Sequence, residues 1–364
     1  MDMKLHLIFV GSKFIYNVGL KEYVIRTIEQ KVYFIDSIVY FKESDNSLFL
    51  HLERELNSSD KIIVVTTKQN FSTIGKVICT TISDNQVLKD GMLIPQKATF
   101  FAERTYLLEH NDSIVNILQI DEGQKMPTLL MDSNTEGSTI HVFQEDRETT
   151  IAILNPIAKM YEVSINVVQE VDGWLRIDVS SNKYGNVSKF NDSAKQLLTR
   201  NLIVSSNIVA YIIQKLTDNQ KKITFAESCT GGLLSYYFTK NNGASNVLDG
   251  SLVTYSNSLK ENWLAVPRET LDDNGAVSYE VVSEMSEGAL NVSNADYALS
   301  ISGIAGEGGG TELKPVGTVY IGVRTETNNS EEHLMFSGDR NYIQHQSALY
   351  AIKMLLLIDK EMFF

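Results

Sequence analysis

The chain has 364 residues, a length that exceeds one ordinary domain and suits two or three. Hydrophobic residues make up 43% and charged residues 21% of the sequence, which excludes a largely disordered, collagen-like or disulfide-scaffold protein. Thirty-two Lys and Arg against 45 Asp and Glu give a net charge of −13. We therefore expect no general binding to nucleic acid, because such binding needs Lys and Arg to neutralise phosphates.

Cysteine use and hydropathy indicate the compartment. Cys79 and Cys229 lie far apart and lack the spacing of metal ligands. The first apolar run has about six residues, too few for a signal peptide. No apolar stretch approaches the ~18 residues that a membrane span needs. We expect a soluble cytoplasmic protein in a reducing compartment, without a membrane partner.

The first third of the chain alternates strand-like apolar segments with segments of helical spacing. Strands are expected at 4–11, 31–41 and 61–67, and helices at 20–30 and 44–56. This succession predicts a parallel α/β domain. Segment 85–123 is expected to be irregular, and 121–127 marks a boundary.

The pattern changes between about 128 and 200. Strands are expected at 138–143, 163–171 and 174–181, and helices at 147–161, which contains Pro156, and at 191–201. This β-α-β-β-α order predicts a small α+β module. A long amphipathic helix is then expected over 201–216 and a strand over 221–228, and the strand–glycine–helix pattern recurs to the C-terminus.

The sharpest local motif is TFAESCTGG at 224–232. A strand leads through Ser228, Cys229 and Thr230 into a turn, and Gly231 and Gly232 then open an apolar helix. Unpaired N–H groups at a helix start favour an anion or oxyanion, and a hydroxyl placed there is a candidate nucleophile. The alternative is that Ser228 or Thr230 simply caps the helix.

A serine nucleophile needs a base, and none of the six histidines lies between 142 and 332. A lysine is the other known solution, and the segment LVTYSNSLK (252–260) supplies Lys260 with Tyr255 nearby. An ordinary lysine has a pKa of about 10.4, so burial or a nearby cation would have to lower that pKa. The alternative is a solvated surface lysine.

Nine of the 22 glycines fall between 275 and 322. An apolar strand ends at Ser302 and a glycine-rich loop follows, which lets a ligand approach the backbone and can cradle phosphate. The loop lacks the Gly-Lys-Ser/Thr of a Walker A motif. A plain flexible connection is the alternative. In SGDR (337–340), Asp339 is typical of a helix cap and Arg340 of a surface charge.

Five motifs, in their order and spacing, resemble the C-terminal domain of the CinA family: AESCTGG, VTYSNSLK, GAVSYEVV, SISGIAGEGGGTELKPVGTVYIGV and FSGDR. The resemblance covers roughly 202–360. It implies a nicotinamide-nucleotide amidase, which converts nicotinamide mononucleotide to nicotinate mononucleotide and ammonia. It also implies catalytic roles for Ser228, Lys260 and Ser302, with Tyr255 in support.

The same resemblance implies a nucleotide substrate, a homodimer, and no metal or organic cofactor. The residues that we expect to bind the substrate are Cys229, Thr230, Gly231, Gly303, Gly306, Gly309 and Arg340. The first three would stabilise an oxyanion, and the others would contact the phosphate.

The order of segments over the whole chain is similar to full-length CinA. That order implies a molybdopterin-binding-like α/β domain (1–125), a KH-like α+β module (126–200) and the amidase domain (201–364). Family members that hydrolyse ADP-ribose carry GGLGPT followed by paired aspartates, whereas TTKQNFSTIG (66–75) has neither. Gly11-Ser12-Lys13 stands where the family has glycine-aspartate-glutamate. The pyrophosphatase activity is therefore predicted to be lost.

Two departures concern the amidase domain. Glu307-Gly308-Gly309-Gly310 replaces the usual Pro-Asp-Gly-Gly, and Gln344 and His345 stand where the family favours arginine. A non-catalytic nucleotide-binding or regulatory protein is therefore an alternative. A nucleic-acid accessory factor is a second one, but the net charge and the absence of a GxxG loop from the middle segment argue against it.

Overall fold

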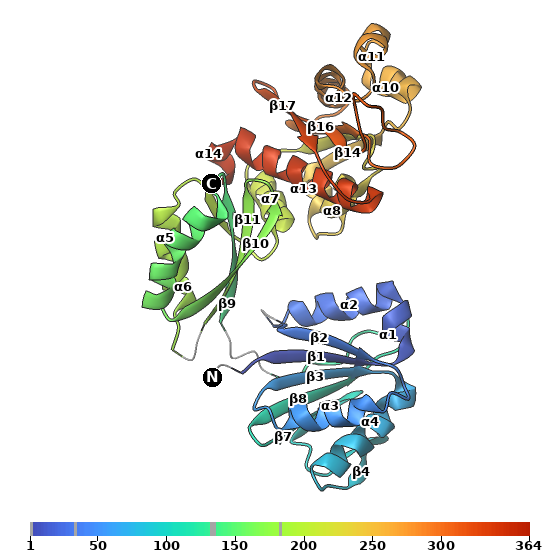
Figure 1. Ribbon diagram of the computed structural model, residues 1–364, viewed down its shortest axis with the longest axis vertical. Coiled ribbons are helices and arrows are strands. Elements are labelled where there is room, and N and C mark those ends of the chain that lie inside the picture. Colours follow the sequence, from blue (N-terminus) through green and yellow to red (C-terminus); the bar gives the residue numbers. More distant parts are fainter. Residues whose placement is uncertain (1–2, 33–34, 132–135, 182–183) are drawn as a thin grey trace. The chain divides into compact units, whose positions relative to one another are not determined.

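A computed structural model describes residues 3–32, 35–131, 136–181 and 184–364. The chain divides into two compact units (Figure 1). The first consists mainly of Met1–Gly137, and the second combines Ser138–Tyr161, Ile165–Val179 and Ser188–Phe364. The predicted α/β class is confirmed, whereas the boundaries between three domains stay a prediction.

The first unit is built on a six-stranded sheet with the order β2-β1-β3-β8-β7-β6. Its strands are β1 (Leu5–Val10), β2 (Ser37–Phe41), β3 (Lys61–Thr66), β6 (Phe100–Ala102), β7 (Thr105–His110) and β8 (Ser113–Gln119). β2, β1, β3 and β8 pair in parallel, while β7 and β6 are antiparallel additions. Of the expected strand 31–41, residues 33 and 34 lie outside the described residues.

Side chains alternate between the two faces of this sheet. Ile8 and Val64 pack in one core with α3 (Ser47–Leu56) and α4 (Lys68–Thr81). Leu7 and Val65 pack in another with α2 (Val18–Glu29) and with Phe14 of α1 (Ser12–Tyr16). Burial on both faces explains why β1 and β3 are continuous apolar runs.

The expectation that 85–123 is irregular is wrong. The segment contains β6, β7, β8 and a hairpin of β4 (Gln86–Lys89) and β5 (Met92–Pro95). Asp90 and Gly91 form the turn of this hairpin and have positive φ angles of 48° and 77°. Asn111 and Asp112 form the turn between β7 and β8, and their φ angles are also positive. Asp-Gly between short apolar stretches is a hairpin signal.

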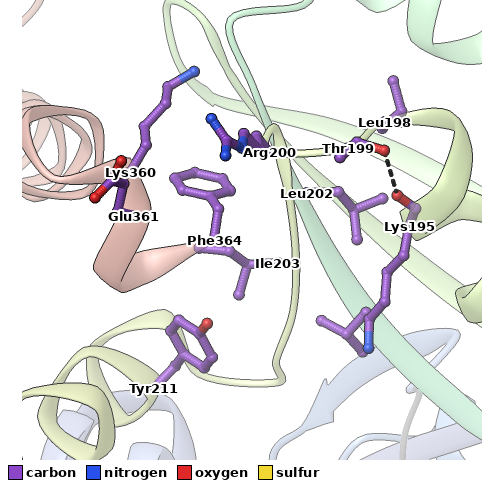
Figure 2. A pocket seen from close by; sticks show the side chains of 11 residues that line it. Lys195, Leu198, Thr199, Arg200, Leu202, Ile203, Tyr211, Lys360, Glu361 and Phe364 are labelled. Atoms are coloured by element: carbon purple, nitrogen blue, oxygen red, sulfur yellow. Dashed lines mark hydrogen bonds between the residues drawn. The ribbon is translucent and has the colours of Figure 1, made fainter. Parts of the chain in front are cut away.

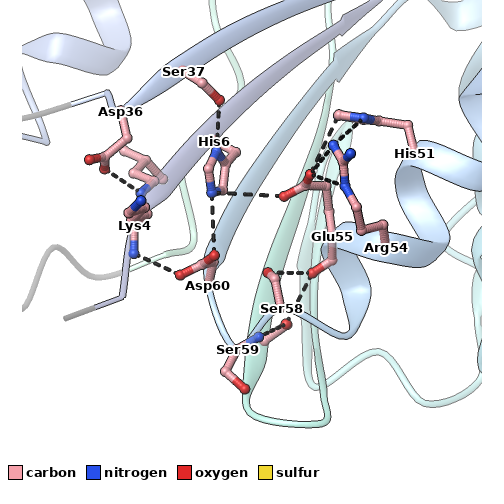
Figure 3. Close-up of polar contacts among 12 residues, drawn as sticks. Lys4, His6, Asp36, Ser37, His51, Arg54, Glu55, Ser58, Ser59 and Asp60 are labelled. Carbon is pink, nitrogen blue, oxygen red and sulfur yellow. Dashed lines mark hydrogen bonds and ion pairs between the residues drawn. The ribbon is translucent and has the colours of Figure 1, made fainter. Parts of the chain in front are cut away.

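A polar cluster occupies the amino ends of β1, β2 and β3 (Figure 3). The His6 ring contacts Ser37 Oγ at 2.7 Å and Asp60 Oδ2 at 3.3 Å. Glu55 lies 3.8 Å from the same ring, and Arg54 Nη2 donates to Glu55 at 2.9 Å. Parallel sheets bind ligands at the opposite, carboxyl ends of their strands, so this cluster has a structural role.

The predicted β-α-β-β-α order of the middle segment is confirmed. Its elements are β9 (Gly137–Phe143), α5 (Arg147–Met160), β10 (Val163–Val171), β11 (Trp174–Ser181) and α6 (Val187–Leu197), with Pro156 inside α5. The predicted helix over 201–216 is wrong at its start. Residues Leu202–Val204 form β12, which completes a sheet of order β10-β11-β9-β12. Asn207 then caps α7 (Ile208–Asp218).

The C-terminal sheet has the order β14-β13-β15-β16-β17. Its strands are β13 (Ile223–Glu227), β14 (Leu248–Val253), β15 (Tyr297–Gly303), β16 (Thr318–Thr325) and β17 (Asn329–Met335). α7, α8 (Leu233–Thr239), α9 (Ala244–Val247), α13 (Arg340–Ile358) and α14 (Lys360–Phe363) contribute to one core. α10 (Asn257–Leu264), α11 (Arg268–Asn274) and α12 (Tyr279–Asn291) contribute to another.

Helix α13 is buried on nearly all sides over its second half. Every residue from Ser347 to Leu356 except Leu349 is buried. α13 therefore serves as a central packing element of its unit. No helix among the described residues combines the length and the apolar character that crossing a bilayer requires.

The close contact between α10 and α12 depends on Gly288. A methyl group at this position would lie 1.9 Å from the carbonyl oxygen of Leu264. Alanine favours a helix by about 1 kcal/mol over glycine, but overpacking costs ~1–3 kcal/mol or more. We expect Gly288→Ala to lower the free energy of unfolding by at least about 1 kcal/mol, measured by urea denaturation.

Gly250→Ala in β14 is the matched control, because the added methyl group meets nothing within 4 Å. Its free energy of unfolding should change by less than about 1 kcal/mol. An unchanged urea midpoint for Gly288→Ala would contradict the close approach of the two helices.

Candidate active site

The site lies where three parallel strands of the C-terminal sheet end. Glu227 of β13 pairs with Val253 of β14 and Ile301 of β15. The next residues of the three strands are Ser228, Thr254 and Ser302. The Ser228 N–H donates to the Ile301 carbonyl at 2.9 Å, and the Thr254 N–H donates to the Glu227 carbonyl at 2.9 Å. This edge is where α/β sheets bind ligands.

Ser228 and Lys260 are in direct contact. Lys260 Nζ lies 3.0 Å from Ser228 Oγ and 2.7 Å from the Thr254 carbonyl oxygen. Lys260 is only 1% exposed, so the alternative of a surface lysine is wrong. Helix α10 carries this lysine inward, and Ser256 caps that helix through the Leu259 N–H. The spacing of the pair suits proton transfer.

Burial shifts the pKa of two groups beside Ser228, the Lys260 amine and the Cys229 thiol. It lowers the pKa of Lys260 to about 8, which leaves a usable fraction of neutral amine near neutral pH. Burial raises the pKa of Cys229 to about 12. A thiol in this environment stays protonated and unreactive, so Ser228 is the better nucleophile.

The cap of helix α8 is Glu227, a residue that the sequence patterns did not indicate. Its fully buried carboxylate accepts from the N–H groups of Gly232, Leu234 and Ser235 at 2.9–3.1 Å. The alternative that Ser228 or Thr230 caps the helix is therefore wrong. The available signal was a charged residue at the end of an apolar strand, where burial requires a partner.

The turn at residues 228–231, the nucleophile turn, contains two backbone N–H groups that are candidate oxyanion donors. The Gly231 N–H donates to the Ser228 carbonyl at 3.1 Å, which corrects its expected role as a free oxyanion donor. Within the described part of the chain, the N–H groups of Cys229 and Thr230 have no acceptor. These two N–H groups can stabilise an oxyanion next to Ser228.

Neither Tyr255 nor Ser302 is hydrogen-bonded to the Ser228–Lys260 pair, so the structure gives no support for the catalytic roles that the resemblance implies for them. Tyr255 is 63% exposed and makes no hydrogen bond to any described residue. Ser302 is buried, but its hydroxyl donates to the Ala276 carbonyl at 2.6 Å and so fastens the turn before α12.

The glycine-rich loop is fixed to its surroundings. Lys314 Nζ donates to the carbonyls of Asn274 and Val277, both at 2.8 Å. A methyl group at Gly306 would lie 2.5 Å from Arg340 Nη2, so the guanidinium covers this glycine. Gly303 and Gly309 are the other two loop glycines that were expected to bind the substrate. A methyl group at Gly303 would lie 2.9 Å from the Thr318 carbonyl oxygen, so this position is tightly packed. A methyl group at Gly309 would lie no closer than 3.3 Å to any atom, so this position has more space.

Arg340 lies at the first position of α13, which Asp339 caps through the Tyr342 N–H at 2.8 Å. The capping role of Asp339 is thus confirmed. Arg340 forms no ion pair with a described carboxylate and stays available to an anion. One turn later, Gln344 Nε2 donates to the Cys229 carbonyl at 2.7 Å, and His345 contacts the Tyr237 hydroxyl.

Two unpartnered hydroxyls flank the Ser228–Lys260 pair. Six buried side-chain polar atoms of the described residues lack a hydrogen-bond partner, and two of them are Thr230 Oγ1 and Thr254 Oγ1. Buried polar groups are normally paired, and exceptions gather at functional sites. Within the same residues, no cluster of His, Cys, Asp and Glu is suited to a metal ion.

One family model of known proteins matches the part of the chain that carries this site. Residues 205–358 match the family model of the CinA C-terminal domain. A CinA-like protein from Thermotoga neapolitana is 47% identical over 144 residues, and one from Fervidobacterium nodosum is 44% identical over 144 residues. Each match covers 40% of this chain and 35% of the relative, so the chain spans about a third of these relatives' length.

A solved structure, the competence/damage inducible protein from Agrobacterium tumefaciens, is 35% identical. The match covers 43% of this chain and 97% of that chain, with a TM-score of 0.41. Residues 205–358, which the family model matches, contain the nucleophile turn, the buried lysine and the glycine-rich loop. On this basis, the chain belongs to the CinA family.

Proposed function

We propose that the C-terminal part of the chain is a nicotinamide-nucleotide amidase, which hydrolyses nicotinamide mononucleotide to nicotinate mononucleotide and ammonia. The observation that carries this proposal is the buried Lys260 amine 3.0 Å from Ser228 Oγ. A buried lysine that contacts a serine hydroxyl is suited to act as its general base. CinA family membership is consistent with this chemistry.

In the proposed mechanism, Ser228 Oγ attacks the carboxamide carbon and neutral Lys260 accepts the hydroxyl proton. The N–H groups of Cys229 and Thr230 stabilise the oxyanion, and each such donor typically contributes ~2.7–4 kcal/mol. The C–N bond then breaks, and Lys260 returns the proton to the departing ammonia. Water attacks the acyl-serine, Lys260 takes a proton from it, and nicotinate mononucleotide leaves as Ser228 is reprotonated.

The substrate's own charges suit the site. Its pyridinium ring makes the carbonyl more electrophilic and disfavours protonation of Lys260. The unpaired guanidinium of Arg340, beside Gly306, is the proposed phosphate ligand. The hydroxyls of Thr230 and Thr254 are proposed to bind the substrate or the attacking water. The homodimer expected from the resemblance is part of the same proposal.

A non-catalytic nucleotide-binding protein is the second candidate. Gln344 favours it, because this residue stands where the family favours arginine and its amide is occupied by the Cys229 carbonyl. For the first unit, we propose that pyrophosphatase activity is absent. Residues 66–75 continue into helix α4 instead of a glycine-rich phosphate loop.

Ser228→Ala and Lys260→Met should each reduce ammonia release from nicotinamide mononucleotide by about 10³-fold or more, because each removes one member of a coupled pair. Purified protein without added metal is assayed for ammonia. Tyr255→Phe is the control and should keep its activity, since this side chain does not touch the pair. A folded and fully active Lys260→Met would refute the dyad.

The ionisation of Lys260 predicts how kcat/KM depends on pH. Its pKa of about 8 means that the neutral, proton-accepting form is gained as the pH rises through 8. kcat/KM should therefore rise about tenfold per pH unit below 8 and level off above that value. The pH profile between 6 and 9.5 measures this. A flat profile over that range would rule out Lys260 as the base.

Thr254→Val tests the unpartnered hydroxyl. It should lower kcat/KM at least about tenfold through loss of a substrate or water contact. The free energy of unfolding should stay the same or rise, because a buried, unsatisfied hydroxyl costs ~1–3 kcal/mol. Activity assays and urea denaturation of the same preparation separate the two effects.

Thr224→Val is the matched control in the neighbouring strand. Thr224 is equally buried, but its hydroxyl donates to the Gly250 carbonyl at 3.1 Å. This variant should lose about 1 kcal/mol of stability and keep its activity. If Thr254→Val instead loses stability and stays active, its hydroxyl has a structural role only.

A further inference from the structure

A cavity of about 670 Å³ lies in the second unit, away from the Ser228–Lys260 pair in sequence (Figure 2). α6 and the segment through β12 provide one part of its lining, and α7, α14 and the chain end provide the rest. Its volume falls within the ~300–1,000 Å³ of sites that bind small organic ligands. The lining residues are Lys195, Leu198, Thr199, Arg200, Leu202, Ile203, Val204, Tyr211, Lys360, Glu361 and Phe364.

The apolar part of the cavity is preformed. Leu198, Leu202 and Ile203 are buried in the surrounding core. The Tyr211 hydroxyl donates to the Phe363 carbonyl at 2.6 Å, which fixes its ring. The Phe364 ring packs edge-on against Phe143 at 5.5 Å. Two held aromatic rings over aliphatic side chains are suited to a flat, aromatic ligand.

The polar part of the cavity is cationic in a chain with a net charge of −13. Lys195, Arg200 and Lys360 line it together with one acidic side chain, that of Glu361. Across the described ranges, none of these three cations forms an ion pair. Lys360 Nζ is held by the amide oxygens of Gln144 and Asn201 and lies 5.8 Å from the centre of the Phe364 ring.

We propose that this cavity binds a nucleoside monophosphate or a closely similar anionic ring compound. The aromatic and aliphatic side chains would contact the base, and the Arg200 guanidinium would bind the phosphate. This proposal does not depend on the amidase proposal, because it involves no residue of the nucleophile turn and is tested by binding alone.

Calorimetric titration of the full chain with adenosine monophosphate tests the proposal, and adenosine and inorganic phosphate serve as separate probes. The nucleotide should bind at least tenfold more tightly than either probe. The double variant Lys195→Gln/Arg200→Gln should weaken nucleotide binding at least tenfold and leave adenosine binding within twofold. Phe364→Ala should weaken both the nucleotide and adenosine.

Arg268→Gln is the control, because it removes an exposed arginine that pairs with Asp272 outside the cavity. It should bind adenosine monophosphate as the parent chain does. Arg340→Gln, which removes the cation beside the nucleophile turn, separates binding in the cavity from binding at the catalytic site. Loss of binding in Arg340→Gln would assign the nucleotide to the catalytic turn and overturn the proposal. So would undiminished binding by the double variant, or no binding by the parent chain.

Discussion

The site depends on keeping a buried carboxylate and a buried amine apart. Glu227 and Lys260 are both buried close to Ser228, and their mutual ion pair would hold the lysine protonated. The backbone N–H groups at the start of α8 prevent this by donating hydrogen bonds to the Glu227 carboxylate and so stabilising its charge. Lys260 is left with a hydroxyl and a carbonyl as partners. Burial then acts on its pKa without opposition from a carboxylate.

The same arrangement shapes the nucleophile turn. Because Glu227 binds the helix N–H groups, the hydroxyl of Ser228 is not needed as a cap and stays directed to Lys260. Gln344 holds the turn from α13 through the Cys229 carbonyl. A carbonyl that accepts a hydrogen bond is fixed in orientation, and so is the peptide unit whose N–H belongs to Thr230. The oxyanion donors are thus preorganised by contacts from two helices.

Much of the fold could be predicted from the sequence, because buried parallel strands such as β1 and β3 are continuous apolar runs. Strands β4, β5 and β6 were missed because they are short and partly exposed, as with the 70% exposed Leu88. Strands β7 and β8 are longer and mostly buried, and their apolar runs were overlooked. The juxtaposition of Ser228 and Lys260 followed from their motifs. The capping of α8 by Glu227 could not be predicted in this way. Sequence rules for helix caps consider residues next to the helix start, whereas Glu227 lies five residues before Gly232. Motifs fix the positions of Tyr255 and Ser302 in the chain but not the direction of their side chains.

A second buried lysine in the same unit shows what distinguishes Lys260. Lys353 also donates to a backbone carbonyl, that of Asp172 at 2.8 Å, and burial lowers its pKa as well. Its amine, however, lies 3.7 Å from the centre of the Tyr350 ring, and the charges of Glu332 and Asp172 raise its pKa. These groups stabilise the cation. Burial alone therefore does not make a lysine a base: Lys260 combines burial with the absence of a stabilising anion and with contact to a hydroxyl.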